Sequence, residues 1–396
     1  IQYIPKYISF FVNIARADSM FKGRALEALA KMISYAPNNL SMDVINVSLQ
    51  MLISAIDLND SSIFSDLLNG FSSLVNRKNQ LLQSSLPKLI DFATGIIFNN
   101  QFGVCISYGE EEDDELIFEK QADCLINAIS LLDEILLENP KILEPKFASN
   151  LFDSLSSFLE NMTSSLGIQK IVSILTTIVQ VYELDPNDFL EKISFLFEEC
   201  EFSYVQAIFE CITNLIKKDA NLNTYTYKNI CKVCCNALNR KLPCFECNDE
   251  VEEEETDDNL NYQTQFMNSV FDCLSIVAKK HPEYLIEKSI LSIFNKTFEL
   301  SIKNKRITEI LSLTEVIGNL FESLQTFGLQ IEGLSLKFLL KNVLNSIQFC
   351  DGTNKPSPLV ALRIIIDKSE ILSSRINDIL NTVNGIFSIE NEGQPY

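Results

Sequence analysis

The sequence has 396 residues, with 32 Lys and Arg against 53 Asp and Glu, which gives a formal net charge of −21. Hydrophobic residues make up 46% of the chain, enough for a large core, so wholesale disorder is excluded. A charge this negative argues against nucleic acid or an anionic membrane as the main partner, because both need a basic surface, and it favours basic partners. With only 12 Gly, the chain is also unlike an all-β protein or one built on Gly-rich phosphate-binding loops.

The ends and the cysteines suggest where such a chain works. No run of about 18 apolar residues occurs, so we expect no transmembrane helix and no insertion into a membrane. The start, IQYIPKYISFF, lacks the basic region and cleavage site of a signal peptide and an initiator Met, so we expect a C-terminal fragment of a longer chain. Most of the 11 cysteines occupy apolar positions of helical segments, which predicts buried thiols in a reducing, intracellular compartment. Examples are Cys124, Cys200, Cys211 and Cys273.

Apolar residues recur at helical spacing through most of the chain. In the segment 20–36, Leu26, Leu29 and Ile33 form one face, and Pro37 ends the helix. Almost no segment alternates apolar and polar residues with a period of two. The sequence therefore predicts an all-α fold.

The predicted helices come in pairs along the chain. First helices are expected at about 1–15, 41–58, 80–98, 145–160, 186–199, 223–240, 283–301 and 330–348. Their partners are expected at about 20–36, 61–76, 116–138, 165–182, 202–218, 260–280, 304–326 and 357–367, with a last helix at about 370–388. The pairs repeat about every 48 residues, near the roughly 40–47 residues of HEAT and armadillo repeats. This predicts an α-α superhelix, a HEAT/ARM-type solenoid of about eight helix pairs, as one continuous array over residues 1–396.

Three longer links interrupt the pairs, and two of them are acidic. We interpret 99–115, 241–259 and the Pro-rich 350–358 as loops. The acidic runs are either solvated segments that keep the protein soluble or an electrostatic contact for a Lys/Arg-rich partner. Their members are Glu110, Glu111, Glu112, Asp113 and Asp114 in the first loop, and Glu252, Glu253, Glu254, Glu255, Asp257 and Asp258 in the second.

Three stretches, in this order, carry a family resemblance. The first is IPKYISFFVNIARADSMFKGRALEALAKM, where residues 22–24 open the second helix of a pair. The second is FGVCISYGEEEDDELIFEKQADCLINAISLL, where an acidic loop leads into a helix opened by residues 118–120. The third, NDEVEEEETDDNLNYQTQFMNSVFDCLS, is an acidic insertion before a helix. Together they resemble the C-terminal half of an importin-β-type (karyopherin) nuclear import receptor, of the importin five and importin four branch.

The resemblance implies a function in nuclear import. Such a chain binds basic protein cargo, such as histones or ribosomal proteins, moves between cytoplasm and nucleus, and works at the nuclear pore without a cofactor. The main repeats that bind the Ran GTPase are N-terminal in the family, so this chain is expected to bind Ran weakly or not at all. The alternative is a HEAT-repeat scaffold subunit of a phosphatase, coat or chromatin-assembly complex.

Two groups of side chains are candidates for partner contacts. Amides on second helices can bind the backbone of an extended peptide, because they both donate and accept hydrogen bonds, although Asn is common throughout this chain. These amides are Asn69, Asn127, Asn214, Asn268 and Asn319. The family also binds Phe-Gly nucleoporins in grooves between outer helices. The candidates for such grooves are Phe10, Phe11, Phe92 and Phe98. Phe at helical spacing is more often an ordinary core residue.

A cluster of cysteines is the strongest local motif. Cys231 and Cys234 form one C-x-x-C pair and Cys244 and Cys247 another, and four thiolates can hold tetrahedral zinc. The gap between the pairs is shorter than the usual interval of about 15–20 residues, and the first pair lies within a helical pattern. Buried thiols, a weak zinc site and a redox pair stay open as alternatives, and no metal is expected.

Catalysis has little support in the sequence. His281 is the only histidine, and it lies at a predicted helix end before a proline, where a surface residue is common. The sequence contains neither the phosphate-binding motif G-x-x-x-x-G-K-[ST] nor the dinucleotide-binding motif G-x-G-x-x-G. We therefore expect a protein that works by binding and flexing, and not an enzyme.

Overall fold

The computed structural model is all-helical in the residues that it describes and has no strand there. Those residues are 3–17, 20–38, 40–58, 60–99, 115–249, 257–331, 333–347 and 357–368. The all-α prediction is therefore confirmed for this part of the chain. No helix within these ranges combines the length and the apolar character needed to cross a bilayer.

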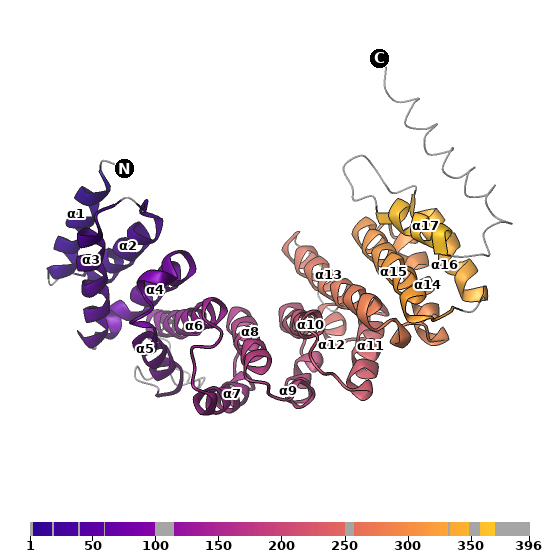
Figure 1. Ribbon diagram of the computed structural model, residues 1–396, viewed down its shortest axis with the longest axis horizontal. Coiled ribbons are helices and arrows are strands. Elements are labelled where there is room, and N and C mark those ends of the chain that lie inside the picture. Colours follow the sequence, from indigo (N-terminus) through magenta and orange to yellow (C-terminus); the bar gives the residue numbers. More distant parts are fainter. Residues whose placement is uncertain are drawn as a thin grey trace, which may run out of the picture. The chain divides into compact units, whose positions relative to one another are not determined.

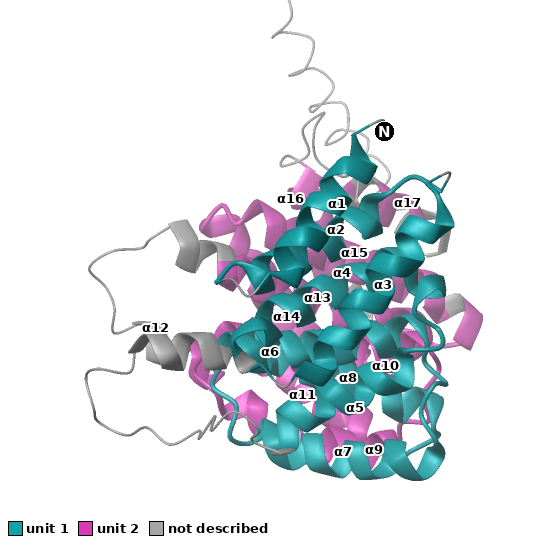
Figure 2. Ribbon diagram, turned by 90° about the vertical axis from the view of Figure 1, so that its left-hand side faces the viewer, with its two compact units in different colours: residues 1–184 teal, residues 185–396 magenta. Residues whose placement is uncertain are grey.

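The chain divides into two compact units, residues 1–184 and 185–396, which Figure 2 distinguishes by colour. Unit 1 contains α1 (Ile4–Arg16), α2 (Lys22–Tyr35), α3 (Met42–Ala55), α4 (Phe64–Lys78), α5 (Leu86–Asn99), α6 (Glu115–Glu138), α7 (Pro145–Leu159) and α8 (Ser165–Val181). Three 3₁₀ turns accompany them: η1 (Ile56–Leu58), η2 (Ser61–Ile63) and η3 (Asn79–Leu81).

Unit 2 continues the same alternation. It contains α9 (Pro186–Lys192), α10 (Phe202–Lys217), α11 (Thr224–Leu238), α12 (Pro243–Asp249), α13 (Asp257–Lys280), α14 (Lys288–Lys303), α15 (Ile307–Phe327), α16 (Gly333–Ser346) and α17 (Ser357–Lys368). The 3₁₀ turns are η4 (Ser194–Glu198) and η5 (Pro282–Tyr284).

Most predicted helices lie where the period placed them, and four segments differ. The helix expected at 283–301 begins at Lys288, because the chain first makes the turn η5. The helix expected at 80–98 begins at Leu86, because the chain first makes the turn η3. The helix expected at 186–199 is broken into α9 and η4. The segment 241–259, expected to be a loop, contains α12 and the first turn of α13. The last expected helix, 370–388, and the link 350–358 lie outside the described residues except for the start of α17.

Each unit is built from two layers of helices. In unit 1 the second helices α2, α4, α6 and α8 pack on one another in sequence order, as Figure 1 shows, and in unit 2 α10, α13, α15 and α17 do the same. First helices flank this layer, with α11, α14 and α16 in contact in unit 2. The core lies between the layers, where the predicted apolar face of α2 is at most 1% exposed at Leu26 and Leu29. Burial of each such Leu stabilises the fold by about 1.5–3 kcal/mol.

Polar side chains connect neighbouring second helices beside this apolar core. Arg24 of α2 lies 3.1 Å from the Asp66 carboxylate of α4. Lys280 Nζ of α13 donates to the Lys217 carbonyl and to the Asp219 carboxylate at the end of α10, at 2.7 and 2.6 Å. A close approach supports the same stacking, because a Cβ added to Gly70 of α4 would lie 2.8 Å from the Ala30 Cβ of α2. The layer is therefore held by directional contacts as well as by apolar burial.

The most buried ion pair among the described residues joins α6 to α8. Asp133 is 2% exposed, and its Oδ2 accepts from Lys170 Nζ at 2.8 Å. Burial raises the pKa of Asp133 above its usual value, and the hydrogen bond and the positive charge of Lys170 oppose that rise. Removing the lysine would leave a carboxylate out of water without its charged partner, which is a costly arrangement.

We predict that Lys170→Met lowers the free energy for opening α6 and α8 by about 3 kcal/mol at neutral pH. Native-state hydrogen exchange of the two helices measures this. Without Lys170, burial alone holds the pKa of Asp133 above its unfolded value, so the folded state binds the proton more tightly, and the loss shrinks as the pH falls through that pKa. Lys192→Met, at the exposed pair with Asp188, is the matched control and should cost under about 1 kcal/mol. Equal losses in both variants would contradict the prediction.

Candidate functional site

The sequence-predicted acidic contacts fall mostly outside what the structure describes. Glu110, Glu111, Glu112, Asp113 and Asp114 lie in the undescribed link before α6, and Glu252, Glu253, Glu254 and Glu255 lie in the undescribed link before α13. Asp257 and Asp258 open α13, but their side chains are not among those described. A role for these carboxylates in binding basic partners stays a prediction.

Three of the five predicted amides join neighbouring second helices. Asn69 Nδ2 of α4 donates to Glu27 Oε1 of α2 at 2.7 Å. Asn127 Nδ2 of α6 donates to Ser65 Oγ of α4 at 3.0 Å. Asn319 Nδ2 of α15 donates to the Ser275 hydroxyl of α13 at 2.5 Å. In this structure these amide donors are used within the fold.

The other two amides, Asn214 and Asn268, line one cleft between α10 and α13. The cleft has a volume of about 380 Å³. From α10 it is lined by Gln206, Glu210, Thr213, Asn214 and Lys217, and from α13 by Gln265, Asn268, Ser269 and Asp272. Each set follows helical spacing, so two polar faces oppose each other across the cleft.

The polar groups of this α10–α13 cleft differ in how far they are already used. The Thr213 and Ser269 hydroxyls donate to carbonyls of their own helices, at 2.8 and 2.7 Å. The side chains of Asn214, Asn268 and Asp272 make no hydrogen bond to another described residue. These three side chains are therefore available to a bound molecule.

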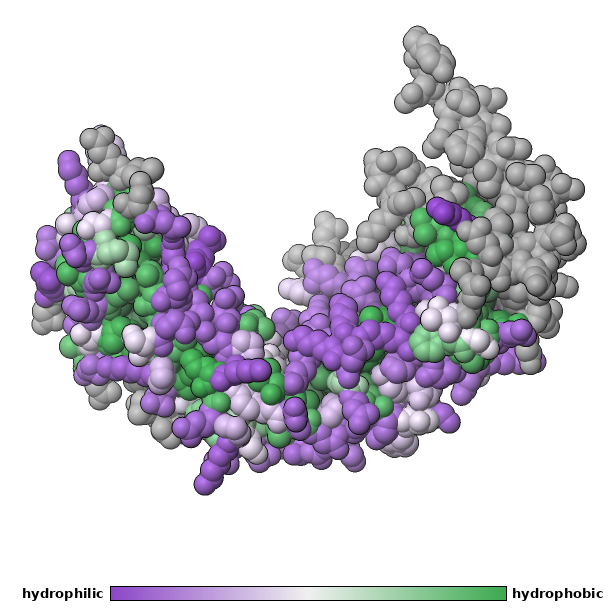
Figure 3. Space-filling view, viewed as in Figure 1, coloured by the Kyte–Doolittle hydropathy of each residue, from purple (hydrophilic) through white to green (hydrophobic). Residues whose placement is uncertain are grey.

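The cleft carries more acidic than basic charge. Glu210 and Asp272 are exposed carboxylates, and Lys217 is the one cation in its described lining. Gln206 Nε2 donates to Glu210 Oε1 at 2.7 Å, which orients that carboxylate. In Figure 3 hydrophilic side chains gather over α10 and α13 on the face shown. Sequence reasoning identified the two amides but not the carboxylates, because an Asp or Glu on a helix surface has no distinguishing pattern.

Asn268 also belongs to a second, smaller cleft. This cleft has a volume of about 150 Å³ and lies between α13 and the first turn of α15. Arg306 and Glu309 line it from the α15 side, and Gln263 lines it from the α13 side. The same amide therefore lies at the boundary between two polar recesses.

The four predicted Phe residues have different environments. Phe92 is 9% exposed and packs edge-on against Phe64 at 4.9 Å between ring centroids, as a core residue does. Phe10 is 56% exposed, and its ring lies 5.4 Å from that of Phe11. Phe98 is partly exposed and contacts Phe158. Only Phe92 is thus clearly explained by core packing.

The cysteine cluster is buried. Cys231 and Cys234 of α11 and Cys244 of α12 form no disulfide and are at most 2% exposed, whereas the side chain of Cys247 lies outside the described residues. A hydrogen bond with Cys273 and burial raise the pKa of the Cys234 thiol. Among the described residues no group of three or more possible metal ligands comes together. The weak zinc alternative therefore gains no support from this part of the chain.

One cysteine does not follow its prediction. Cys200 was expected at a buried helical position, but it lies exposed in the bend before α10 and is disulfide-bonded. The residue lies in the short link between η4 and α10, and not on a helix face that packs into the core.

His281 lies at the end of α13, as expected. Its ring centroid lies 4.3 Å from that of Tyr227, and Nδ1 lies 3.4 Å from Glu283 Oε1. Tyr284 stacks on the same Tyr227 ring, with 4.9 Å between the two ring centroids. The histidine therefore has a packing role in the aromatic cluster between α11 and η5.

We predict that the buried thiols react slowly with iodoacetamide in the folded protein. Burial raises the pKa of Cys235 to about 11 and that of Cys244 to about 12. Two units of pKa leave about a hundredfold less thiolate than an ordinary cysteine has, and buried atoms also exclude the reagent. Mass spectrometry of time points, with glutathione as the reference thiol, measures the ratio. Rapid labelling of these thiols without denaturant would show that α11 and α12 open readily.

Comparisons with known proteins add no relative. No protein-family model matches the chain, and no curated protein sequence matches it. What is established, for the residues that the structure describes, is an all-helical fold whose second helices stack in order within each unit and whose unit 2 carries a polar, acidic cleft between α10 and α13.

Proposed function

We propose that this chain is a non-catalytic solenoid of HEAT-type helix pairs that binds basic, extended segments of partner proteins. The observation that carries the proposal is the α10–α13 cleft, where the unused amides of Asn214 and Asn268 lie with the carboxylates of Glu210 and Asp272. Helical repeats commonly bind partners along such extended layers of helices.

The chemistry of the cleft suits a peptide with Lys or Arg side chains. A side-chain amide can donate to a peptide carbonyl and accept from a peptide N–H, and so hold an extended backbone whatever its sequence. A carboxylate accepts charge-assisted hydrogen bonds from Lys or Arg, each worth about 1.5–3 kcal/mol. The two kinds of group together select an extended, basic segment.

We further propose that the partners are basic cargo proteins carried into the nucleus, as the sequence resemblance implies. The net charge of −21 supports long-range attraction of basic cargo, and the acidic runs before α6 and α13 would add to it at low salt. In this proposal Phe-Gly nucleoporins bind elsewhere on the chain. In the family that the sequence resembles, Ran binds mainly through N-terminal repeats, so we propose at most weak binding of Ran to this chain.

A static scaffold in another complex is the second candidate. It is favoured by the amides of Asn69, Asn127 and Asn319, which join neighbouring second helices and would stiffen the stack. A transport receptor needs small movements between pairs, whereas a scaffold needs a fixed spacing. Pull-down with a basic localisation peptide and with Phe-Gly repeats separates the two, because a scaffold binds neither.

We predict that a Lys-rich peptide binds the chain at low salt and that Glu210→Gln with Asp272→Asn raises its Kd about tenfold. The Gln and Asn oxygens still accept hydrogen bonds, so the double variant loses only the charge contribution, about 1.4 kcal/mol in total at these exposed positions. Fluorescence anisotropy of the labelled peptide measures it, and raising the salt should weaken binding to the unmodified chain.

Two further variants define the role of the amides. Asn214→Ala with Asn268→Ala should weaken binding of the same peptide about thirtyfold, since each amide contributes about 1 kcal/mol. Asn46→Ala is the matched control, because Asn46 is an exposed amide on α3 of unit 1 and should leave the Kd unchanged. Binding that is equally strong in all variants would remove the α10–α13 cleft from the proposal.

A further inference from the structure

The link between α14 and α15 is a basic, exposed turn in an acidic chain. α14 ends at Lys303 and α15 begins at Ile307. Lys305 has a φ of 55°, in the left-handed region, which turns the chain between the two helices. All residues from 303 to 308 are exposed, and three of the first four are Lys or Arg. We call residues 303–308 the α14–α15 turn.

The α14–α15 turn carries a sequence pattern that no other part of the chain repeats. The sequence has five pairs of adjacent Lys or Arg residues, at 77–78, 217–218, 240–241, 279–280 and 305–306. Only the last pair is followed two residues later by a hydroxyl side chain, that of Thr308. Positive charge therefore precedes Thr308, and the negative charge of Glu309 follows it. A protein kinase with an acidic substrate groove selects its acceptor by basic side chains of this kind.

The hydroxyl of Thr308 is available for reaction. Thr308 is the second residue of α15, and its side chain makes no hydrogen bond with another described residue. With Arg306 it lines the smaller cleft between α13 and α15. The Arg306 side chain is 42% exposed and lies 3.8 Å from the Glu309 carboxylate. An enzyme can therefore reach both the acceptor and the basic side chain two positions before it.

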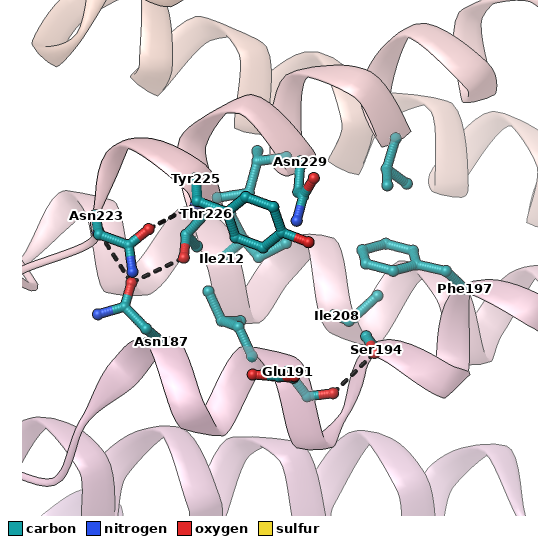
Figure 4. Close-up of a pocket in the computed structure, with 13 residues that line it drawn as sticks. Asn187, Glu191, Ser194, Phe197, Ile208, Ile212, Asn223, Tyr225, Thr226 and Asn229 are labelled. Atoms are coloured by element: carbon teal, nitrogen blue, oxygen red, sulfur yellow. Dashed lines mark hydrogen bonds between the residues drawn. The ribbon is translucent and has the colours of Figure 1, made fainter.

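The start of α15 is held less firmly than the start of α11. In α11 the Asn223 side chain accepts from the Thr226 N–H at 2.9 Å, and the Thr226 hydroxyl donates to Asn187 at 2.8 Å, as Figure 4 shows. Arg306 lies at the capping position of α15, where its side chain has no acceptor to offer. The Thr308 N–H has no acceptor among the described residues. The first turn of α15 can therefore open into the extended form that a kinase binds.

Glu309 determines where such an opening stops. Its carboxylate accepts from the Ser301 hydroxyl of α14 at 2.8 Å and pairs with Arg240 beyond the end of α11. Its side chain is only 13% exposed. These contacts hold the third residue of α15, so the residues before it can move while the rest of the helix stays in place.

We propose that Thr308 is a phosphorylation site for a Ser/Thr protein kinase that selects basic residues before its acceptor. The kinase transfers the terminal phosphoryl group of ATP. A bond forms between Thr308 Oγ1 and phosphorus, the bond from that phosphorus to the ADP oxygen breaks, and the hydroxyl proton passes to a carboxylate of the kinase. The product carries a charge of about −1.5 to −2 in the first turn of α15, where Arg306 and the free Thr308 N–H stabilise it.

A phosphate on Thr308 also affects the α10–α13 cleft. The smaller cleft that Thr308 lines shares Asn268 with the α10–α13 cleft. The phosphate adds negative charge on the α15 side of Asn268 and so attracts a basic segment more strongly. This regulatory step rests on the proposed function, whereas the modification of Thr308 does not.

Incubation of the full 396-residue chain with Mg-ATP and the catalytic subunit of cAMP-dependent protein kinase is the direct test. We expect mass spectrometry to find phosphate on Thr308 and none at this position in Thr308→Val. Lys305→Gln with Arg306→Gln should slow the transfer about tenfold, since charge-assisted contacts with the kinase are lost. Lys288→Gln with Lys296→Gln removes the same charge from exposed positions of α14 and should leave the rate unchanged. Circular dichroism confirms that each variant is folded.

Two results would overturn the site. One is the absence of transfer to the folded chain while a synthetic peptide of residues 301–312 is phosphorylated, which would show that the first turn of α15 does not open. The other is equal labelling of Thr224, an exposed residue at the start of α11 with no Lys or Arg in the five positions before it.

The phosphorylated chain provides the second measurement, with identically treated Thr308→Val as the control. Amide exchange in the first turn of α15 should slow about two- to fivefold, and unchanged exchange would show that the turn does not hold the phosphate. The Kd of the Lys-rich peptide should fall about two- to fivefold at low salt. Phosphorylation with an unchanged Kd would overturn the regulatory step. An unmodified chain that does not bind the peptide would overturn the proposed function and leave the phosphorylation site in place.

Discussion

The stacking of each second helix on the next is the constraint on which the rest of each unit depends. A helix such as α4 packs between α2 and α6, and its Phe64 ring meets Phe92 of α5. The polar residues on those flanks must then find partners across the same contact. Asn69 with Glu27, Asn127 with Ser65, and Lys170 with Asp133 meet this need from one helix to the next.

The use of amides for stacking explains why the remaining amides stand out. Asn214 and Asn268 occupy comparable positions on second helices, yet they face a cleft and not a neighbour. The contact between α10 and α13 is instead joined at its end by Lys280, which reaches the last turn of α10. That leaves the middle of the two helices open and polar, which is the arrangement that a bound extended segment requires.

The helices themselves were largely predictable, because the 3.6-residue period is strong where one face is buried. Helices were expected at 165–182 and 202–218, and the observed helices α8 and α10 begin at the expected residues and end one residue earlier. The helix expected from 80 begins only at Leu86, and the sequence carried the signal for that start in Pro87, which lies in the first turn of α5. The break between α9 and η4 had no such signal, since neither Gly nor Pro lies within 187–200, and packing against α10 and α12 accompanies it.

Helix ends were harder to predict for a related reason. Glu183, Asp219, Arg240 and Lys305 have φ between 54° and 57°, the left-handed conformation that usually signals Gly after a helix. The chain has only 12 Gly, and none of these four helix ends carries one at the left-handed position. The usual Gly signal for the end of a helix was therefore missing from the sequence. The two recesses were less predictable still, because each depends on which faces of different helices come into register. Asn214 and Asn268 were identifiable one at a time, but their opposition across a cleft is a tertiary property.

The position of Asn268 has a consequence for stoichiometry. One side chain forms part of the wall of both the α10–α13 cleft and the smaller recess beside α15. Its amide can point to only one of them at a time, so the two recesses are not independent binding sites. A single chain passing over α13 would satisfy both, whereas two separate molecules would compete for the shared amide, and their affinities would not add.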